Sequence, residues 1–360
     1  RARPGRGPRH GGGRPAPALA ALDLGTNNCR LLVARPKGPD FEVIDAFSRP
    51  VRLGEGVESS NRLTEEAQAR AIKALRICAS KIRHHRARAH RIVATEACRR
   101  AENGAAFIER AERATGLRLR IIEAGEEARL AVAGCAPLID PEAEQLLVFD
   151  IGGGSTELIW IDLSRTEPEG RRGLVRRLSP TFGEARGDDP AAHAITDWIS
   201  VPMGVSTLNE RFGHIADEPA RFAEMTALFD SALARFAPYR EAERRRQTGK
   251  LQIVGVSGTA TTFGAVHLGL RGYDRSRVDG LWLPSAAAQA IAEELLALGL
   301  EGRVRHPGIG RGRASLVLSG AAILATILRI WPVERMRIAD RGLREGMLYG
   351  LIERHRAEGR

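Results

Sequence analysis

The sequence predicts an α/β protein whose two domains face each other across a cleft. A chain of 360 residues is too long for one ordinary hydrophobic core and suits two domains. Strand-like and helix-like stretches alternate along the chain, which favours α/β layers over separate all-α and all-β parts. A glycine-rich hairpin pattern occurs twice in one register, which indicates a duplicated domain.

The hairpin pattern is clearest at residues 147–160, LVFDIGGGSTELIW. Two apolar runs, typical of buried strands, enclose three glycines and two hydroxyl side chains. A glycine turn lets backbone N–H groups converge on one point, which makes an anion site. Asp150 and Glu157 flank the turn, and carboxylates beside a phosphate usually hold or orient a hard cation such as Mg²⁺. This stretch therefore predicts a hairpin that binds phosphate and metal.

The earlier copy is LDLGTNNCRLLV, at residues 22–33. When Asp23 is aligned with Asp150, the two stretches match without a gap. The further pairs are Gly25 with Gly152, Asn28 with Ser155, Arg30 with Glu157 and Leu31 with Leu158. One such hairpin is weak evidence, because a glycine turn without function is at least as common. Two in register predict phosphate-facing hairpins opposed across a cleft.

The remaining elements follow in α/β order. In the first domain, predicted at 18–142, we expect strands at 41–47, 91–94 and 119–122, and helices at 64–86, 105–115 and from 125. The second, predicted at 143–342, resumes after an irregular insertion at 162–189. We expect order over 199–212, a helix at 218–236, a strand at 251–254, a glycine–threonine turn at 255–262 and a buried helix at 315–328.

Composition narrows the class of protein. The chain is 43% hydrophobic and 28% charged, which describes a soluble globular protein. Its net charge is +11, and residues 1–17 carry five arginines and no acid, leaving +6 (11 − 5) elsewhere. That glycine- and proline-rich segment cannot build a core and is expected to be a disordered basic tail. The basic balance favours a polyanionic substrate.

Several other classes are disfavoured. The apolar stretch at 16–24 is too short for a signal-peptide core, and the one at 315–328 is shorter than the ~20 residues that span a bilayer. Aromatic content of 5%, with no aromatics interleaved in a basic stripe, disfavours nucleic-acid binding. The chain has no P-loop or dinucleotide motif, and its four cysteines have no zinc or disulfide spacing. Reduced thiols in a cytoplasmic protein are the expectation.

Three further stretches follow predicted strands, and each has both a functional and a purely structural interpretation. Glu127 stands in the first turn of a helix, where acids interact favourably with the helix dipole without any function. The preceding strand is expected to end at the cleft, however, and a carboxylate there suits a general base. Arg99 or Arg100 is either a phosphate clamp or an exposed turn residue. Gly258 and Thr259 offer N–H groups to a phosphate or form a plain capped turn.

Together these residues resemble the exopolyphosphatase and guanosine pentaphosphate phosphohydrolase family, in the actin, sugar-kinase and heat-shock ATPase superfamily. The resemblance runs from residue 20 to about 349. It is carried by seven segments in the family's order: 23–27, 95–103, 126–129, 150–157, 202–204, 257–259 and 342–346. It implies two RNase-H-like domains about a phosphate-binding cleft, with the C-terminal helix, 343–360, packing back on the first domain. It also implies Mg²⁺-dependent removal of a terminal phosphate by water.

The resemblance also implies roles for individual residues. Glu127 would activate water, and Asp150 and Glu157 would position Mg²⁺ and the attacking water. The phosphate cradle would comprise Asp23, Gly25, Thr26, Asn27, Arg99, Gly152, Gly153, Gly154, Ser155, Gly258 and Thr259. The chain departs from the family's pattern at 123–127, where a glycine is displaced, at Asn28, and at Ser315, where an aspartate is frequent. The all-helical domain of longer members is absent from this sequence.

The leading prediction is hydrolysis of the terminal phosphoanhydride of inorganic polyphosphate. Guanosine pentaphosphate (pppGpp) is the alternative or additional substrate, because both share the reacting group. A kinase acting on an alcohol would need an aspartate base, and a sensor that only binds the tetraphosphate (ppGpp) would not need Glu127, Asp150 and Glu157. The sequence leaves open the preferred chain length, a need for K⁺, a homodimer, and the role of the tail and insertion.

Overall fold

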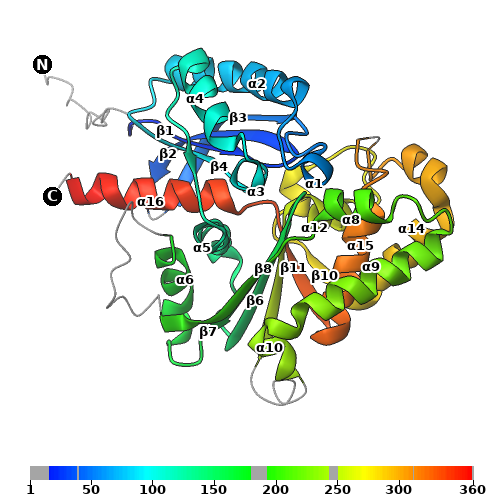
Figure 1. The fold of residues 1–360 in the computed structure, drawn as a ribbon. Coiled ribbons are helices and arrows are strands. Elements are labelled where there is room, and N and C mark those ends of the chain that lie inside the picture. Colours follow the sequence, from blue (N-terminus) through cyan, green and yellow to red (C-terminus); the bar gives the residue numbers. More distant parts are fainter. Residues whose placement is uncertain (1–15, 39, 180–192, 243–249, 311, 359–360) are drawn as a thin grey trace, which may run out of the picture.

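A computed structural model describes residues 16–38, 40–179, 193–242, 250–310 and 312–358 (Figure 1). The basic tail predicted at 1–17 lies outside the described residues except for its last two positions. The described chain forms two mixed sheets covered by helices, which confirms the predicted α/β class with two domains. Among the described residues, no helix combines the length and the apolar character needed to cross a membrane.

The first sheet has the strand order β3-β2-β1-β4-β5. β1, β2 and β3 are antiparallel, whereas β4 and β5 run parallel to β1. The strands are β1 (Leu19–Leu24), β2 (Asn28–Lys37), β3 (Asp40–Pro50), β4 (Ala89–Ala94) and β5 (Arg120–Ile121). This is the strand order and direction of an RNase-H-like domain.

Helices cover one face of this sheet. They are α1 (Val57–Ser60), α2 (Glu65–His84), α3 (Glu96–Arg100) and α4 (Gly104–Thr115). Two of them, α2 and α4, lie where the sequence predicts helices. The Thr64 hydroxyl accepts a hydrogen bond from the Ala67 amide at 3.2 Å, so Thr64 is the N-cap of α2, as its sequence predicts. α2 buries Ala67, Ala71, Leu75, Cys78 and Ile82 against the sheet, and this apolar stripe is what stabilises the helix there.

The second sheet repeats the first. Its order is β10-β11-β9-β6-β7-β8, and without the edge strand β10 this matches the first sheet strand for strand. β6, β7 and β8 are antiparallel, β9 runs parallel to β6, and β11 runs parallel to β9. The strands are β6 (Gln145–Ile151), β7 (Thr156–Asp162), β8 (Ile195–Val201), β9 (Leu251–Val256), β10 (Trp282–Pro284) and β11 (Arg335–Ala339). The duplication predicted from the hairpins is confirmed.

One face of the second sheet carries most of the helices of that half of the chain. They are α8 (Val205–Phe212), α9 (Glu218–Ala232), η2 (Leu233–Arg235), α10 (Ala237–Arg240), α12 (Ser257–His267), α13 (Arg275–Val278), α14 (Ser285–Arg305) and α15 (Val317–Ile330). α15 is the buried helix expected at 315–328, and its apolar side chains lie in the largest hydrophobic core.

The insertion predicted as irregular at 162–189 contains a helix, so that expectation was wrong for part of it. α6 (Pro168–Arg177) begins with a proline in its first turn and buries Leu174 and Val175. Together with Leu178 they pack in the core shared by the second sheet and η1 (Ala136–Leu138). Residues 180–192 lie outside the described part of the chain. The boundary predicted between 142 and 143 falls between η1 and β6.

Two helices cross between the sheets. α5 (Ala124–Gly134) and α16 (Leu343–Glu358) pack together, and α16 also lies against β1, β2 and β4 (Figure 1, red helix beneath the blue strands). The crossing is so close that a Cβ on Gly346 would overlap the Leu130 carbonyl, and one on Gly134 would overlap the Gly342 carbonyl. Glycine at both positions is therefore required by the approach of the two backbones.

Candidate active site

The two hairpin turns have the same geometry, which confirms the alignment predicted from sequence. Asp23 is paired with Arg30 in the first hairpin, and Asp150 is paired with Glu157 in the second. The turns close alike: the Gly25 amide donates to the Asn28 carbonyl at 2.9 Å, and the Gly152 amide donates to the Ser155 carbonyl, also at 2.9 Å. Each hairpin therefore places an aspartate and a turn at the same edge of its sheet.

The turns meet across a cavity of about 660 Å³ that both of them line. A Cβ on Gly153 would lie 2.7 Å from Asn27 Nδ2, and one on Gly154 would lie 2.9 Å from Glu96 Cγ. Only glycine allows this approach. Among the described residues, the N–H groups of Gly153 and Gly154 donate to no backbone carbonyl, so they are available to an anion in the cavity.

The N-terminus of helix α8 donates hydrogen bonds to the glycine turn. The amide of Val205 donates to the Gly152 carbonyl at 2.9 Å, and that of Ser206 donates to the Gly153 carbonyl at 2.8 Å. The Ser206 hydroxyl also accepts a hydrogen bond from Asn27 Nδ2 at 3.0 Å, which ties the two turns together. The first turn of α8, which directly follows the segment 202–204, therefore orients the glycine turn by hydrogen-bonding its carbonyls.

Several carboxylates line the same cavity, among them the four predicted ones, Asp23, Glu127, Asp150 and Glu157. Burial raises the pKa of Asp23 to about 6, and the Arg30 guanidinium opposes this shift. Burial, followed by the charge of Asp150, raises the pKa of Glu157 to about 7, although the hydroxyl of Ser200 donates to it at 2.7 Å. The pKa of Asp150 is also raised by burial. This much buried negative charge calls for a cation.

Glu127 stands at the start of α5, with its side chain 17% exposed. Burial and the nearby Glu157 raise its pKa well above the usual range, and Arg99 opposes them. Arg99 donates to Glu127 Oε2 at 3.1 Å, to the Ile122 carbonyl at 2.7 Å and to Glu96 Oε2 at 2.5 Å. Arg99 therefore fixes the orientation of Glu127.

The structure gives Arg99 partners that the sequence did not predict. We expected its guanidinium to hold a phosphate, but two carboxylates already occupy it and it does not line the cavity. The side chain turns toward Glu127 because β4 and β5 are adjacent parallel strands, which brings their following helices together. The sequence could not show this pairing, since Glu127 and Arg99 are separated by a strand and a helix.

The glycine–threonine turn predicted at 255–262 also reaches the cavity. Gly258 and Thr259, in the first turn of α12, line it, so their position agrees with an anion site at a helix start. Ser257 before them has φ 75°, an unusual conformation for a residue with a side chain. The Thr259 hydroxyl lies close to Gly320 of α15.

Sequence reasoning missed several residues that line the cavity. These are Arg30, Arg313, Arg344 and Tyr273. A signal existed for Arg30, which aligns with Glu157 and therefore shares its place beside the turn. Arg344 lies within the segment 342–346 that the resemblance used, but no role was assigned to it. Arg313 and Tyr273 come from loops, and nothing local marks them.

The raised pKa values predict a stability that depends on pH. The pKa of Glu157 is about 7 in the folded protein, against the ordinary glutamate value of 4.5, so the folded state disfavours its ionisation and unfolding becomes easier as pH rises through this window. In EDTA, we expect Glu157→Gln to lose about 2 kcal/mol less unfolding free energy than the unsubstituted protein between pH 5 and 8. Urea unfolding at both pH values measures this. Equal losses in the two proteins would show that Glu157 titrates normally.

Comparison with known proteins gives one consistent result. The model of the Ppx/GppA phosphatase family matches residues 32–355. The chain is 26% identical to the Ppx/GppA family member of Aquifex aeolicus, with a TM-score of 0.72, covering 94% of this chain and 98% of that one. It is 28% identical to an exopolyphosphatase-like protein, with a TM-score of 0.78, covering 95% and 99% of the two chains.

An exopolyphosphatase from Cytophaga hutchinsonii shares the fold, at 22% identity and a TM-score of 0.77 over 93% of this chain and 98% of that one. The family match begins within β2, after the first hairpin turn, and covers the rest of the first sheet, the whole second sheet and most of the crossing helix α16. The opposed turns, the buried carboxylates and these similarities lead to one assignment. The chain belongs to the Ppx/GppA phosphatase family and is a hydrolase.

Proposed function

We propose that this protein is a Mg²⁺-dependent exopolyphosphatase, which releases the terminal phosphate of inorganic polyphosphate by attack of an activated water. One cavity holds both the free amides of Gly153 and Gly154 and, beside them, a buried carboxylate fixed by an arginine. An anion site next to an oriented base is what hydrolysis of a terminal phosphoanhydride requires. This juxtaposition supports the proposal most directly.

The donor set fits Mg²⁺. In phosphoryl-transfer sites this ion is bound by one or two carboxylates, completing its shell with substrate phosphates and water. Accordingly, no group of three His, Cys, Asp or Glu side chains among the described residues is placed to hold a metal alone. Asp150 and Glu157 would hold the ion, with Asp23 beside them; the buried Oδ1 of Asp23 has no hydrogen-bond partner in the part of the chain that the structure describes. When bound, the ion neutralises charge on the phosphate oxygens.

The residues then have distinct tasks. Free amides of the glycine turn and of the start of α12 grip the terminal phosphate, which positions it and stabilises its charge. Glu127 accepts the proton of the attacking water, and its raised pKa makes it a stronger base than an exposed glutamate. Arg99 keeps the carboxylate aimed at the water. The bond to the bridging oxygen breaks, and the shortened chain leaves as an anion.

A second substrate is favoured by the apolar part of the cavity lining. Tyr273, Ile309 and Leu316 belong to this lining, and an inorganic chain needs no aromatic or apolar wall. Tyr273 is 51% exposed, so its ring can be covered by a ligand. A purine stacks well on such a surface. We therefore keep guanosine pentaphosphate as a further substrate, with its triphosphate in the catalytic part.

Phosphate release by purified protein tests this function. We expect EDTA-sensitive release of orthophosphate from long-chain polyphosphate with Mg²⁺, and release from guanosine pentaphosphate under the same conditions. Tyr273→Ala should weaken only the nucleotide reaction, because the inorganic chain does not use the ring. Release from neither substrate, or release that EDTA leaves unchanged, would contradict the proposal.

We also propose a cytoplasmic location. The four cysteines are all free and buried. A protein with four unpaired thiols suits a reducing compartment.

A further inference from the structure

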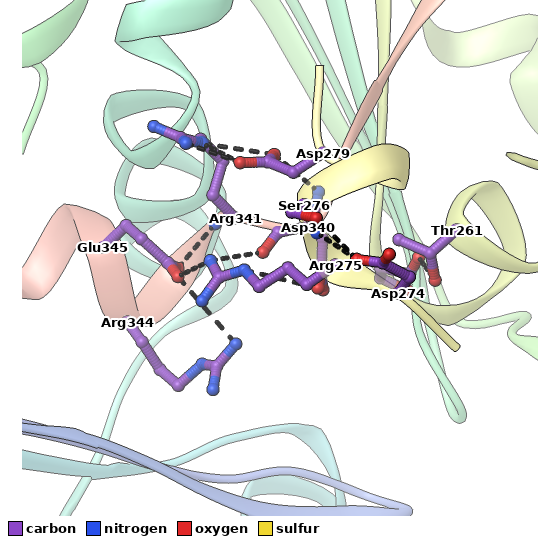
Figure 2. A network of polar contacts seen from close by, with 11 residues as sticks. Thr261, Asp274, Arg275, Ser276, Asp279, Asp340, Arg341, Arg344 and Glu345 are labelled. Atoms are coloured by element: carbon purple, nitrogen blue, oxygen red, sulfur yellow. Dashed lines mark hydrogen bonds and ion pairs between the residues drawn. The ribbon is translucent and has the colours of Figure 1, made fainter. Parts of the chain in front are cut away.

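Arg344 occupies an unusual position at the N-terminal end of the C-terminal helix. It lies in the first turn of α16, and its side chain, 13% exposed, lines the same cavity as the catalytic carboxylates. Figure 2 shows this side chain directed away from the pair formed by Asp279 and Arg341, toward the strands of the first domain (blue). No role has been given to it so far.

Ion pairs fix the backbone that carries Arg344. Glu345, only 1% exposed, accepts hydrogen bonds from the Gly342 amide at 2.9 Å and from Arg275 Nη2 at 2.7 Å. Arg275 also donates to the Asp340 carbonyl at 2.7 Å, and Arg341 pairs with Asp279 at 2.5 Å (Figure 2). The start of α16 is therefore held to the second domain before the helix continues along the first. This anchoring presents Arg344 to the cavity from a rigid support.

Among the described residues, Arg344 has acidic neighbours but makes no short ion pair. Its recorded ion pair, with Glu345, is 3.9 Å long, and that carboxylate already accepts two shorter hydrogen bonds. Burial lowers the pKa of Arg344, Glu345 and Asp340 oppose this, and the like charge of Arg30 lowers it further. Arg30 and Arg344 thus line one cavity from opposite domains, and both act on the buried Asp23. A buried cation in this position is stabilised by an anion placed between the two.

The order of strands locates this anion relative to the reaction. In the second sheet, the cavity edge passes from Glu157 on β7 to Asp150 on β6, then past β9 to the end of β11, where Arg344 follows. From β6 to β11 is two strand spacings, or about 10 Å. Glu127 lies on the other side, since Glu157 is the charge that most affects its pKa after burial. Asp23 and Asp150 therefore separate Arg344 from the base.

We propose that Arg344 binds a phosphate on the leaving side of the scissile bond, holding the chain that departs rather than the phosphate that water attacks. The ligand class is a linear phosphoanhydride with at least one phosphate beyond the terminal one. The proposed function is needed only to say that this phosphate belongs to the leaving chain; the phosphate contact itself does not depend on it. Arg344 would then distinguish a phosphate chain from a single phosphate.

The test compares orthophosphate with inorganic tripolyphosphate. Both are titrated calorimetrically with Mg²⁺ into the full chain in a Glu127→Gln background, which prevents turnover. Arg344→Gln should weaken tripolyphosphate binding roughly tenfold to a hundredfold, because a charge-assisted contact is lost, and should change orthophosphate binding less than about twofold. Arg344→Lys should recover part of the loss, since it keeps the charge but not the planar fork.

Arg329→Gln is the matched control. Arg329 lies near the end of α15, and its side chain is 57% exposed and paired with Asp230. The substitution therefore removes the same charge as Arg344→Gln, but outside the cavity. It should change neither affinity. An Arg344→Gln protein that melts at the same temperature yet binds tripolyphosphate as the background does would overturn the inference, as would equal weakening of both ligands. No tripolyphosphate binding in the background protein would also overturn it.

The outcomes separate this inference from the proposed function. If the unsubstituted protein releases phosphate from polyphosphate while Arg344→Gln binds tripolyphosphate normally, the inference falls and the function stands. If the unsubstituted protein releases no phosphate but tripolyphosphate binding still depends on Arg344, the function falls and Arg344 remains a phosphate-chain ligand.

Discussion

Glu127→Gln is expected to lower kcat for phosphate release by about 10²- to 10⁴-fold while leaving polyphosphate affinity nearly unchanged. The amide keeps the size of the side chain and its contact with Arg99, so the cavity retains its shape. It cannot accept the proton of the attacking water. Steady-state phosphate release gives kcat, and calorimetric titration gives affinity. The same measurement separates a hydrolase from a protein that only binds the alarmone, because the latter has no turnover to lose.

Glu126→Gln is the matched control for this variant. Glu126 neighbours Glu127 on α5, but it pairs with Arg91 and Arg120 and does not line the cavity. Its substitution should leave kcat within about twofold, since the carboxylate is no part of the charge array around the water. Similar losses of kcat in both variants would mean that α5, rather than the Glu127 carboxylate, had been disturbed.

Gly346→Ala should destabilise the fold by about 3 kcal/mol or more. Alanine normally favours a helix by up to about 1 kcal/mol over glycine, so this prediction opposes the ordinary propensity. The added Cβ would overlap the Leu130 carbonyl, and neither backbone can move without separating α5 from α16. Both helices line the junction of the two sheets, so activity should fall as well. Urea unfolding followed by circular dichroism measures the loss.

Gly173→Ala supplies the contrast. Gly173 also lies inside a helix, α6, but its nearest neighbour to a new Cβ is the end of the Arg177 side chain at 3.6 Å. Alanine should fit there and stabilise the protein slightly. A Gly346→Ala protein as stable as Gly173→Ala would contradict the close helix crossing.

The sequence predicted the hairpins well, because their evidence is local. Each hairpin is one contiguous stretch that contains a buried strand, an acid, a glycine turn and a second strand. Because the two copies align in register, both domains were expected to share the same hairpin. The same is true of α2, whose cap and apolar stripe lie within one stretch. Predictions of this kind depend on residues that are neighbours in the chain.

The rest depended on contacts between distant segments. Arg99 was assigned to phosphate because its partners, Glu96 and Glu127, come together only when β4 and β5 pair. α6 was missed because its core contacts come from few apolar residues within a highly charged stretch. The approach of Arg30 and Arg344 joins a strand of the first domain to the last helix, and no periodicity records it.

The most direct test of the central claim is a reaction in ¹⁸O-labelled water with medium-length polyphosphate and Mg²⁺. Attack of an activated water on the terminal phosphorus predicts that each orthophosphate released carries one ¹⁸O from solvent and that chains shorten one unit at a time. Mass spectrometry of the orthophosphate and gel analysis of the chains give both answers. Orthophosphate without solvent ¹⁸O, or chains cut in their interior, would contradict water attack at the terminal phosphate.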